Sequence, residues 1–141
     1  MISTPLASSL RDAGLRWRPT PGDRFVLPHL DLDGQVFTLS EMTIEAHHHA
    51  TGTILGFNGT TEWALDAVAQ EDALWLPSEE QLRDRLGTTF VSLAATAPHH
   101  YAVTTRSASG LRTTYRADVA VDAYAMALLD LIGRAMDGSV S

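Results

Sequence analysis

The sequence of 141 residues contains no cysteine and no lysine. The absence of cysteine excludes disulfides, thiolate nucleophiles, zinc fingers and iron–sulfur clusters. All ten basic residues are arginine, which excludes a Walker A loop, a Schiff base and the usual kinase lysine, because each needs an ammonium group. These two absences remove more classes of function than any motif in the chain supplies.

Long apolar runs are also missing. No stretch approaches the ~20 apolar residues that a bilayer demands, and Ser8, Ser9, Arg11 and Asp12 interrupt any apolar core near the N-terminus. We therefore predict a cytoplasmic protein with no membrane partner. The net charge of −7 disfavours binding to nucleic acid or to anionic membranes, and the length fits one domain over residues 1–141.

The stretch 57–86 carries the clearest local signals. Asn58-Gly59 precedes an amphipathic pattern that predicts a helix over about 60–70, with Glu62 in its first turn. The apolar run 73–76 is too short for a helix and predicts a buried extended segment. Ser78 and Gln81 then form the pattern of a capping box, which predicts a second helix ending at Gly87.

The rest of the chain predicts further helices and strands. Helical spacing and start signals favour an N-terminal helix over about 4–13 and a C-terminal helix after Asp118. Extended patterns predict strands at 25–27, 36–39 and 90–95, and hairpins that pair 42–48 with 53–57 and 101–106 with 111–117.

The predicted fold class is therefore α+β. It comprises a mainly antiparallel sheet of about five or six strands, with the N-terminal helix, two short central helices and the C-terminal helix packed on it. We expect Trp63, Trp75 and the C-terminal helix to meet in one core across that sheet.

Histidines form the only cluster of candidate functional residues in the sequence. Alternation along a strand puts Glu45, His47 and His49 on one face, where they can form a metal site with two nitrogens and one oxygen, joined by His99 or His100. Three solvated imidazoles at a hairpin end explain the same residues, because metal sites usually draw their ligands from separated elements. A divalent metal is thus the only cofactor that the sequence suggests. If the histidines are simply solvated, the protein has no cofactor.

Other catalytic arrangements lack their motifs. No GxSxG elbow is present, so we expect no serine hydrolase, and we identify no catalytic residue. Arg106, Arg112 and Arg116 share one face of the predicted final hairpin and can contact RNA or phosphate. That face offers no aromatic partner for bases, and three arginines opposite threonines also fit a solvated sheet face.

Four blocks carry a resemblance to a known family: LRWRPTPGDRFVLP (15–28), FTLSEMTIE (37–45), GFNGTTEWALDAV (56–68) and ALWLPSEEQLRDRLG (73–87). With them, the chain resembles a family of small actinobacterial proteins of unknown function over most of its length. Some members carry the label of pilus assembly proteins, which this sequence does not support because it has no nucleotide-binding loop. The resemblance implies no catalytic residue.

These observations favour a non-catalytic accessory or protein-interaction domain. The expected partner is another protein or a second copy, bound through an exposed sheet face or a free strand edge. One alternative is a metal-binding protein or metal-dependent hydrolase that uses the His47–His49 cluster. The other is an RNA or phosphate binder that uses Arg106, Arg112 and Arg116.

Overall fold

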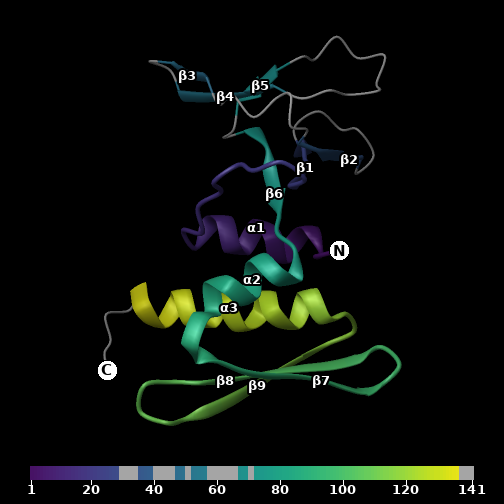
Figure 1. Cartoon of the computed structure of the whole chain (residues 1–141), viewed down its shortest axis with the longest axis vertical. Coiled ribbons are helices and arrows are strands. Elements are labelled where there is room, and N and C mark those ends of the chain that lie inside the picture. Colours follow the sequence, from purple (N-terminus) through teal and green to yellow (C-terminus); the bar gives the residue numbers. More distant parts are fainter. Residues whose placement is uncertain (29–34, 40–46, 50–51, 57–66, 70–71, 137–141) are drawn as a thin grey trace. The chain divides into compact units, whose positions relative to one another are not determined.

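The computed structural model of the chain describes residues 1–28, 35–39, 47–49, 52–56, 67–69 and 72–136 (Figure 1). The chain divides into two compact units. The terminal unit comprises residues 1–15 and 77–141, and the central unit comprises residues 16–76. The single domain over 1–141 stays a prediction.

An aromatic row forms the core of the central unit. Strands β1 (Arg24–Val26), β2 (Val36–Thr38) and β6 (Leu74–Leu76) make an antiparallel sheet in the order β2-β1-β6. Phe25 lies opposite Phe37 on one side and Trp75 on the other, and Trp17 stacks on Trp75 with ring centroids 6.3 Å apart. The predicted buried segment at 73–76 and the predicted strands at 25–27 and 36–39 are confirmed.

A buried carboxylate organises the loop that enters this sheet. Asp23 is only 5% exposed, and it accepts hydrogen bonds from the indole Nε1 of Trp17 at 2.9 Å and from the backbone N–H of Thr20 at 3.0 Å. The hydroxyl of Thr20 also donates to it, at 3.1 Å. A buried carboxylate needs such donors because its charge is costly to remove from water. Asp23 therefore fixes the indole of Trp17 against the aromatic row.

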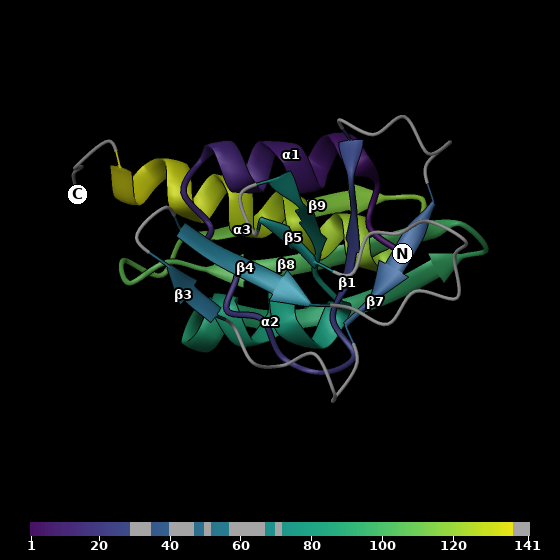
Figure 2. The same ribbon diagram turned by 90° about the horizontal axis from the view of Figure 1, so that it is seen from above.

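A second three-stranded sheet lies in the central unit. Strand β4 (Gly52–Gly56) pairs with β3 (His47–His49) and with β5 (Ala67–Ala69), both antiparallel (Figure 2). The predicted pairing of 42–48 with 53–57 is confirmed over the described strands. The helix predicted over 60–70 is wrong at its C-terminal end, because Ala67–Ala69 forms β5. The remainder of that helix, and Trp63, lie outside the described residues.

The terminal unit is layered around its longest helix. Helix α3 (Ala120–Met136) lies between helices α1 (Thr4–Asp12) and α2 (Glu79–Leu86) on one side and an antiparallel sheet on the other (Figure 1). That sheet has the order β7-β8-β9, from β7 (Phe90–Ala97), β8 (His100–Arg106) and β9 (Arg112–Ala117). The 3-10 turn η4 (Gly87–Thr89) joins α2 to β7. The predicted terminal helices, the strand at 90–95 and the final hairpin are confirmed.

Local signals explain where α2 begins and ends. The Ser78 hydroxyl accepts from the Gln81 backbone N–H at 3.2 Å, and the Gln81 side chain accepts from the Ser78 backbone N–H at 2.9 Å. This is the predicted capping box, and it satisfies two backbone donors that the first turn leaves without partners. Gly87 ends the helix at φ 57°, a region that favours glycine.

Helix α3 is buried on more than the single stripe that its sequence predicts. Val121, Tyr124 and Leu128 of the predicted stripe are buried, and Ala123 and Ala127 are buried as well. Small alanine side chains suit this position because α3 packs against helices and a sheet at once. Among the helices that the structure describes, none has the length and apolarity needed to span a bilayer.

The sheet arrangement corrects one prediction. The fold is α+β and its described strand pairs are antiparallel, as expected, but these strands form three separate three-stranded sheets rather than one sheet of five or six. Trp75 belongs to the sheet β2-β1-β6, whereas α3 packs against β7-β8-β9. Alternating patterns identify strands, but they do not state which strands pair.

Candidate interaction surface

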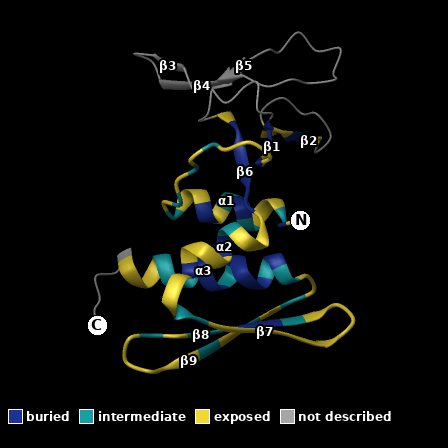
Figure 3. Cartoon of the chain, in the orientation of Figure 1, coloured by how far each residue is buried: buried dark blue, intermediate teal, exposed yellow. Residues whose placement is uncertain are grey.

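Strand β7 forms an exposed edge of the terminal unit's sheet. It pairs with β8 on one side, and every residue from Val91 to Ala97 is exposed (Figure 3). The apolar side chains of Val91 and Leu93 are 37% and 39% exposed. None of the eight residues Phe90–Ala97 is charged, and none is proline. Natural edge strands usually carry such residues to prevent pairing with other chains, so β7 lacks this chemical protection of its edge.

Two bulges limit the regular part of this edge. The pairing with β8 shifts between Phe90 and Ser92, and again between Ala95 and Ala97, so Val91 and Thr96 are the extra residues. Ser92 to Ala95 pair without interruption between these bulges. The edge thus offers a short regular segment.

The sheet face away from α3, here called the outer face, carries three arginines. Arg106 lies directly opposite Arg112, and Arg116 lies opposite Ala102, with all three guanidinium-bearing residues exposed. The hydroxyls of Thr104 and Thr114 hydrogen-bond across the same face at 3.0 Å. In the described part of the chain, none of the three arginines forms an ion pair. The predicted grouping of these arginines on one face of the hairpin is confirmed.

A hollow of about 270 Å³ opens at the end of the sheet that holds the β7–β8 turn, and residues of both faces line it, among them Tyr101 and Ala117. Its lining spans all three strands, from Thr96 of β7 through His100 of β8 to Arg116 of β9. Ala102 also lines it, and Asp118 is its single acidic residue. An imidazole and a guanidinium that face one hollow can both donate hydrogen bonds to an anion.

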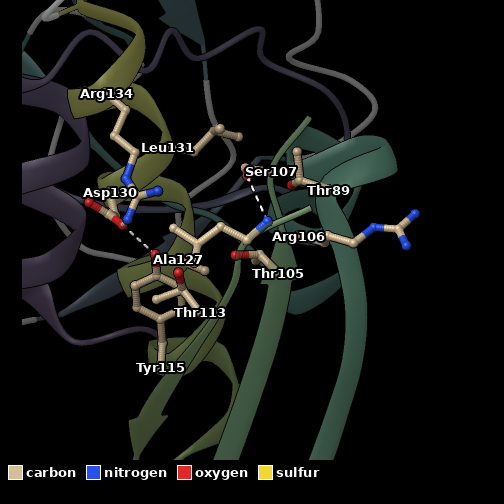
Figure 4. A pocket seen from close by; sticks show the side chains of 11 residues that line it. Thr89, Thr105, Arg106, Ser107, Thr113, Tyr115, Ala127, Asp130, Leu131 and Arg134 are labelled. Atoms are coloured by element: carbon tan, nitrogen blue, oxygen red, sulfur yellow. Dashed lines mark hydrogen bonds and ion pairs between the residues drawn. The ribbon is translucent and has the colours of Figure 1, made fainter. Parts of the chain in front are cut away.

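The opposite face of the sheet holds a smaller pocket against α3, with a lining of apolar and polar side chains (Figure 4). Its volume is about 60 Å³, and Tyr115, Asp130 and Arg134 line one wall. The Tyr115 hydroxyl donates to Asp130, and Arg134 forms an ion pair with Asp130 at 3.0 Å. Figure 4 shows that Arg106, although it borders this pocket, directs its guanidinium away from the other side chains.

This polar cluster stabilises the contact between sheet and helix. Burial raises the pKa of Tyr115, and the hydrogen bond to Asp130 and the charge of Asp130 raise it further, while Arg134 acts in the opposite direction. A tyrosine with a raised pKa keeps its proton at neutral pH, and its hydroxyl donates a hydrogen bond to the carboxylate. Such a phenol is a poor general base or nucleophile, so we interpret the cluster as a link between β9 and α3.

The residues of the predicted metal site are only partly described. His47 and His49 are in β3, with backbones opposite Ile54 and Gly52, and Glu45 lies outside the described residues. His99 occupies the β7–β8 turn at φ 62°, and His100 begins β8. Within the described ranges, no three His, Asp or Glu side chains form a group that could hold a metal ion. The metal site at Glu45, His47 and His49 stays a prediction.

Comparison with protein-family models, with curated proteins and with solved structures finds no match to this chain. The resemblance to small actinobacterial proteins therefore stays a prediction. The functional argument depends on the side chains and strand edges themselves.

Two features of this surface escape the sequence analysis. His100, which the sequence analysis considers only as a further metal ligand, is the first residue of β8 and lines the hollow beside Arg116. The bulge that places Thr96 in the same lining depends on the register between β7 and β8, which no local pattern encodes. The absence of charge between Phe90 and Ala97 is the one signal in the sequence that could have identified β7 as the receptive edge.

Proposed function

We propose that this chain is a non-catalytic protein-interaction domain that binds an extended segment of a partner protein along the free edge of β7. The observation that carries the proposal is an eight-residue edge strand with no charge, no proline and exposed side chains from Val91 onward. The cytoplasmic location predicted from the sequence is part of this proposal.

The chemistry of binding follows from the backbone. An edge strand presents a row of N–H and C=O groups, and an extended segment can satisfy them by adding a strand. Main-chain hydrogen bonds supply affinity in this mode, and the exposed side chains of Val91 and Leu93 add apolar contact. The regular run from Ser92 to Ala95 suits a short segment of a partner.

A lysine placed on the edge tests this proposal. Ala94→Lys puts a charge in the middle of the regular run, and Ala108→Lys makes the same substitution at an exposed position in the turn between β8 and β9. We expect peptides selected from a random display library on the unmodified protein to bind Ala94→Lys at least tenfold more weakly, because edge charges oppose strand addition. Ala108→Lys is expected to retain their binding.

Amide hydrogen exchange provides a second measurement. Bound peptide is expected to slow exchange within Ser92 to Ala95, because strand addition protects outward N–H groups. Equal peptide affinity for the unmodified protein and Ala94→Lys would contradict the proposal. Sedimentation of the protein alone identifies self-pairing as the occupant if it shows a dimer that Ala94→Lys dissociates.

A further inference from the structure

The sheet of the terminal unit is basic although the protein is acidic. Residues 90–117 contain Arg106, Arg112 and Arg116 and no aspartate or glutamate, which gives this segment a charge of +3. Because the whole chain has a net charge of −7, the remaining residues together carry −10. The charge of the sheet is therefore opposite in sign to that of the rest of the chain.

The arrangement of these arginines is unfavourable in isolation. Arg106 and Arg112 face each other directly across β8 and β9, and like charges in that position destabilise a sheet. In the described residues no carboxylate forms an ion pair with them. Negative charge brought by a ligand would relieve this repulsion.

We propose that the segment that docks on β7 is acidic, and that one of its carboxylates enters the hollow lined by His100 and Arg116. This inference rests on the proposed function, because it names the chemistry of the same partner. The hollow reaches Thr96 of the edge strand, so it begins beside the position that an added strand occupies. The exposed arginines of β8 and β9 then face the acidic side chains of the added segment.

The hollow suits a singly charged carboxylate. Its lining includes two side chains that can donate, the imidazole of His100 and the guanidinium of Arg116, together with the small side chain of Ala102. The Thr96 hydroxyl already donates to the backbone carbonyl oxygen of His100, at 3.4 Å. Asp118 also lines it and adds one negative charge. That charge repels a phosphate dianion more strongly than a carboxylate.

A protein segment fits this surface better than a nucleic acid does. Tyr115 belongs to the face that packs toward α3, opposite Val103. Among the residues that line the hollow, Tyr101 is the single aromatic one, whereas the binding of a strand of bases relies on several rings in succession. A nucleic acid would also extend beyond the sheet toward the other residues of the terminal unit (1–15, 77–89 and 118–141), whose charges of 0, −1 and −3 add to −4. A short acidic strand contacts the basic sheet alone.

Two synthetic peptides test the inference. One alternates threonine and glutamate over eight residues, so that an extended conformation places all four carboxylates on one side, and its control replaces glutamate by glutamine. We expect the glutamate peptide to bind at least tenfold more tightly at low salt, with the difference shrinking as sodium chloride is added. Arg116→Gln is expected to remove most of that difference, whereas Arg18→Gln, an exposed arginine of the central unit, is expected to preserve it.

The possible outcomes separate the two proposals. If the unmodified protein binds the glutamate and glutamine peptides equally and Ala94→Lys binds neither, the acidic partner is overturned and the proposal of strand addition stands. Glutamate-peptide binding that Arg116→Gln does not weaken overturns the assignment of the hollow. No binding of the glutamate peptide at millimolar concentration overturns the inference. Tighter binding of inorganic phosphate or of oligouridylate, lost in Arg116→Gln, overturns it in favour of a phosphate ligand.

Discussion

Asp23 offers the most direct test of the energetics of the central unit. Its carboxylate is buried and accepts hydrogen bonds from Trp17 and from two groups of Thr20, at distances of 2.9 to 3.1 Å. Hydrogen bonds to a charged acceptor contribute about 1.5–3 kcal/mol each. Thr20 is exposed and Trp17 is half-buried. When the carboxylate is removed, their N–H and O–H groups can therefore bind water, which offsets part of the lost hydrogen-bond energy. We expect Asp23→Ala to lower the free energy of unfolding by about 3 kcal/mol.

The measurement is urea unfolding followed by tryptophan fluorescence, with Asp23→Asn as the isosteric variant and Asp12→Ala as the control. Asp23→Asn keeps the shape and one acceptor oxygen, so we expect an intermediate loss. The Asp12 side chain is 72% exposed, and among the described residues its ion pair is with its neighbour Arg11, at 3.4 Å. Its removal should therefore change the free energy of unfolding by less than ~0.5 kcal/mol. A loss below ~1 kcal/mol for Asp23→Ala would refute this account of the buried carboxylate.

The same experiment tests the single-domain prediction. All three tryptophans are in residues 16–76, whereas the helices that the structure describes are all in the terminal unit. Fluorescence and far-ultraviolet circular dichroism therefore follow different units. If Asp23→Ala shifts both transitions together, the chain unfolds as one cooperative domain. A shift in the fluorescence transition alone would show two independent domains.

Two further predictions concern the terminal unit. Ser78→Ala removes half of the capping box, and we expect a loss of about 1 kcal/mol in the free energy of unfolding, measured in urea against Ser92→Ala; an unchanged midpoint would contradict the capping role. The raised pKa of Tyr115 means that the folded protein holds this proton more tightly than the unfolded chain does, so its contribution is complete below about pH 10 and is lost as pH rises through the folded pKa. Urea midpoints between pH 9 and pH 11 should therefore fall, and Tyr115→Phe should reduce the fall; an equal decline in both proteins would contradict the assignment.

Local sequence signals predict those parts of the fold that depend on a few neighbouring residues. The capping box at Ser78, the buried segment around Trp75 and the final hairpin all follow from patterns within about ten residues, and all are confirmed. The residues that determine each of these features lie within the same short segment of the chain. This is why one sequence suffices to predict them.

The features that the sequence does not predict depend on pairing between distant segments. Ala67–Ala69 has the helical pattern of its neighbours, yet its backbone pairs with β4 and forms a strand. The single sheet was expected because strand patterns carry no information about partners, and the chain forms three sheets instead. Alternation along a hairpin identifies the arginines of the candidate surface, whereas the lining of the hollow beside His100 includes Thr96, the extra residue of a bulge in β7.

The two edge strands of the sheet β7-β8-β9 differ in charge, and this difference affects whether molecules can add to one another in a fibre. β7 carries no charge, whereas β9, the other edge strand, carries Arg112 and Arg116. Fibre formation needs two receptive edges on each molecule, so that every added subunit exposes a new one. With one receptive and one cationic edge, a molecule that has accepted a strand stops there. The asymmetry therefore allows a finite complex while opposing open-ended polymerisation.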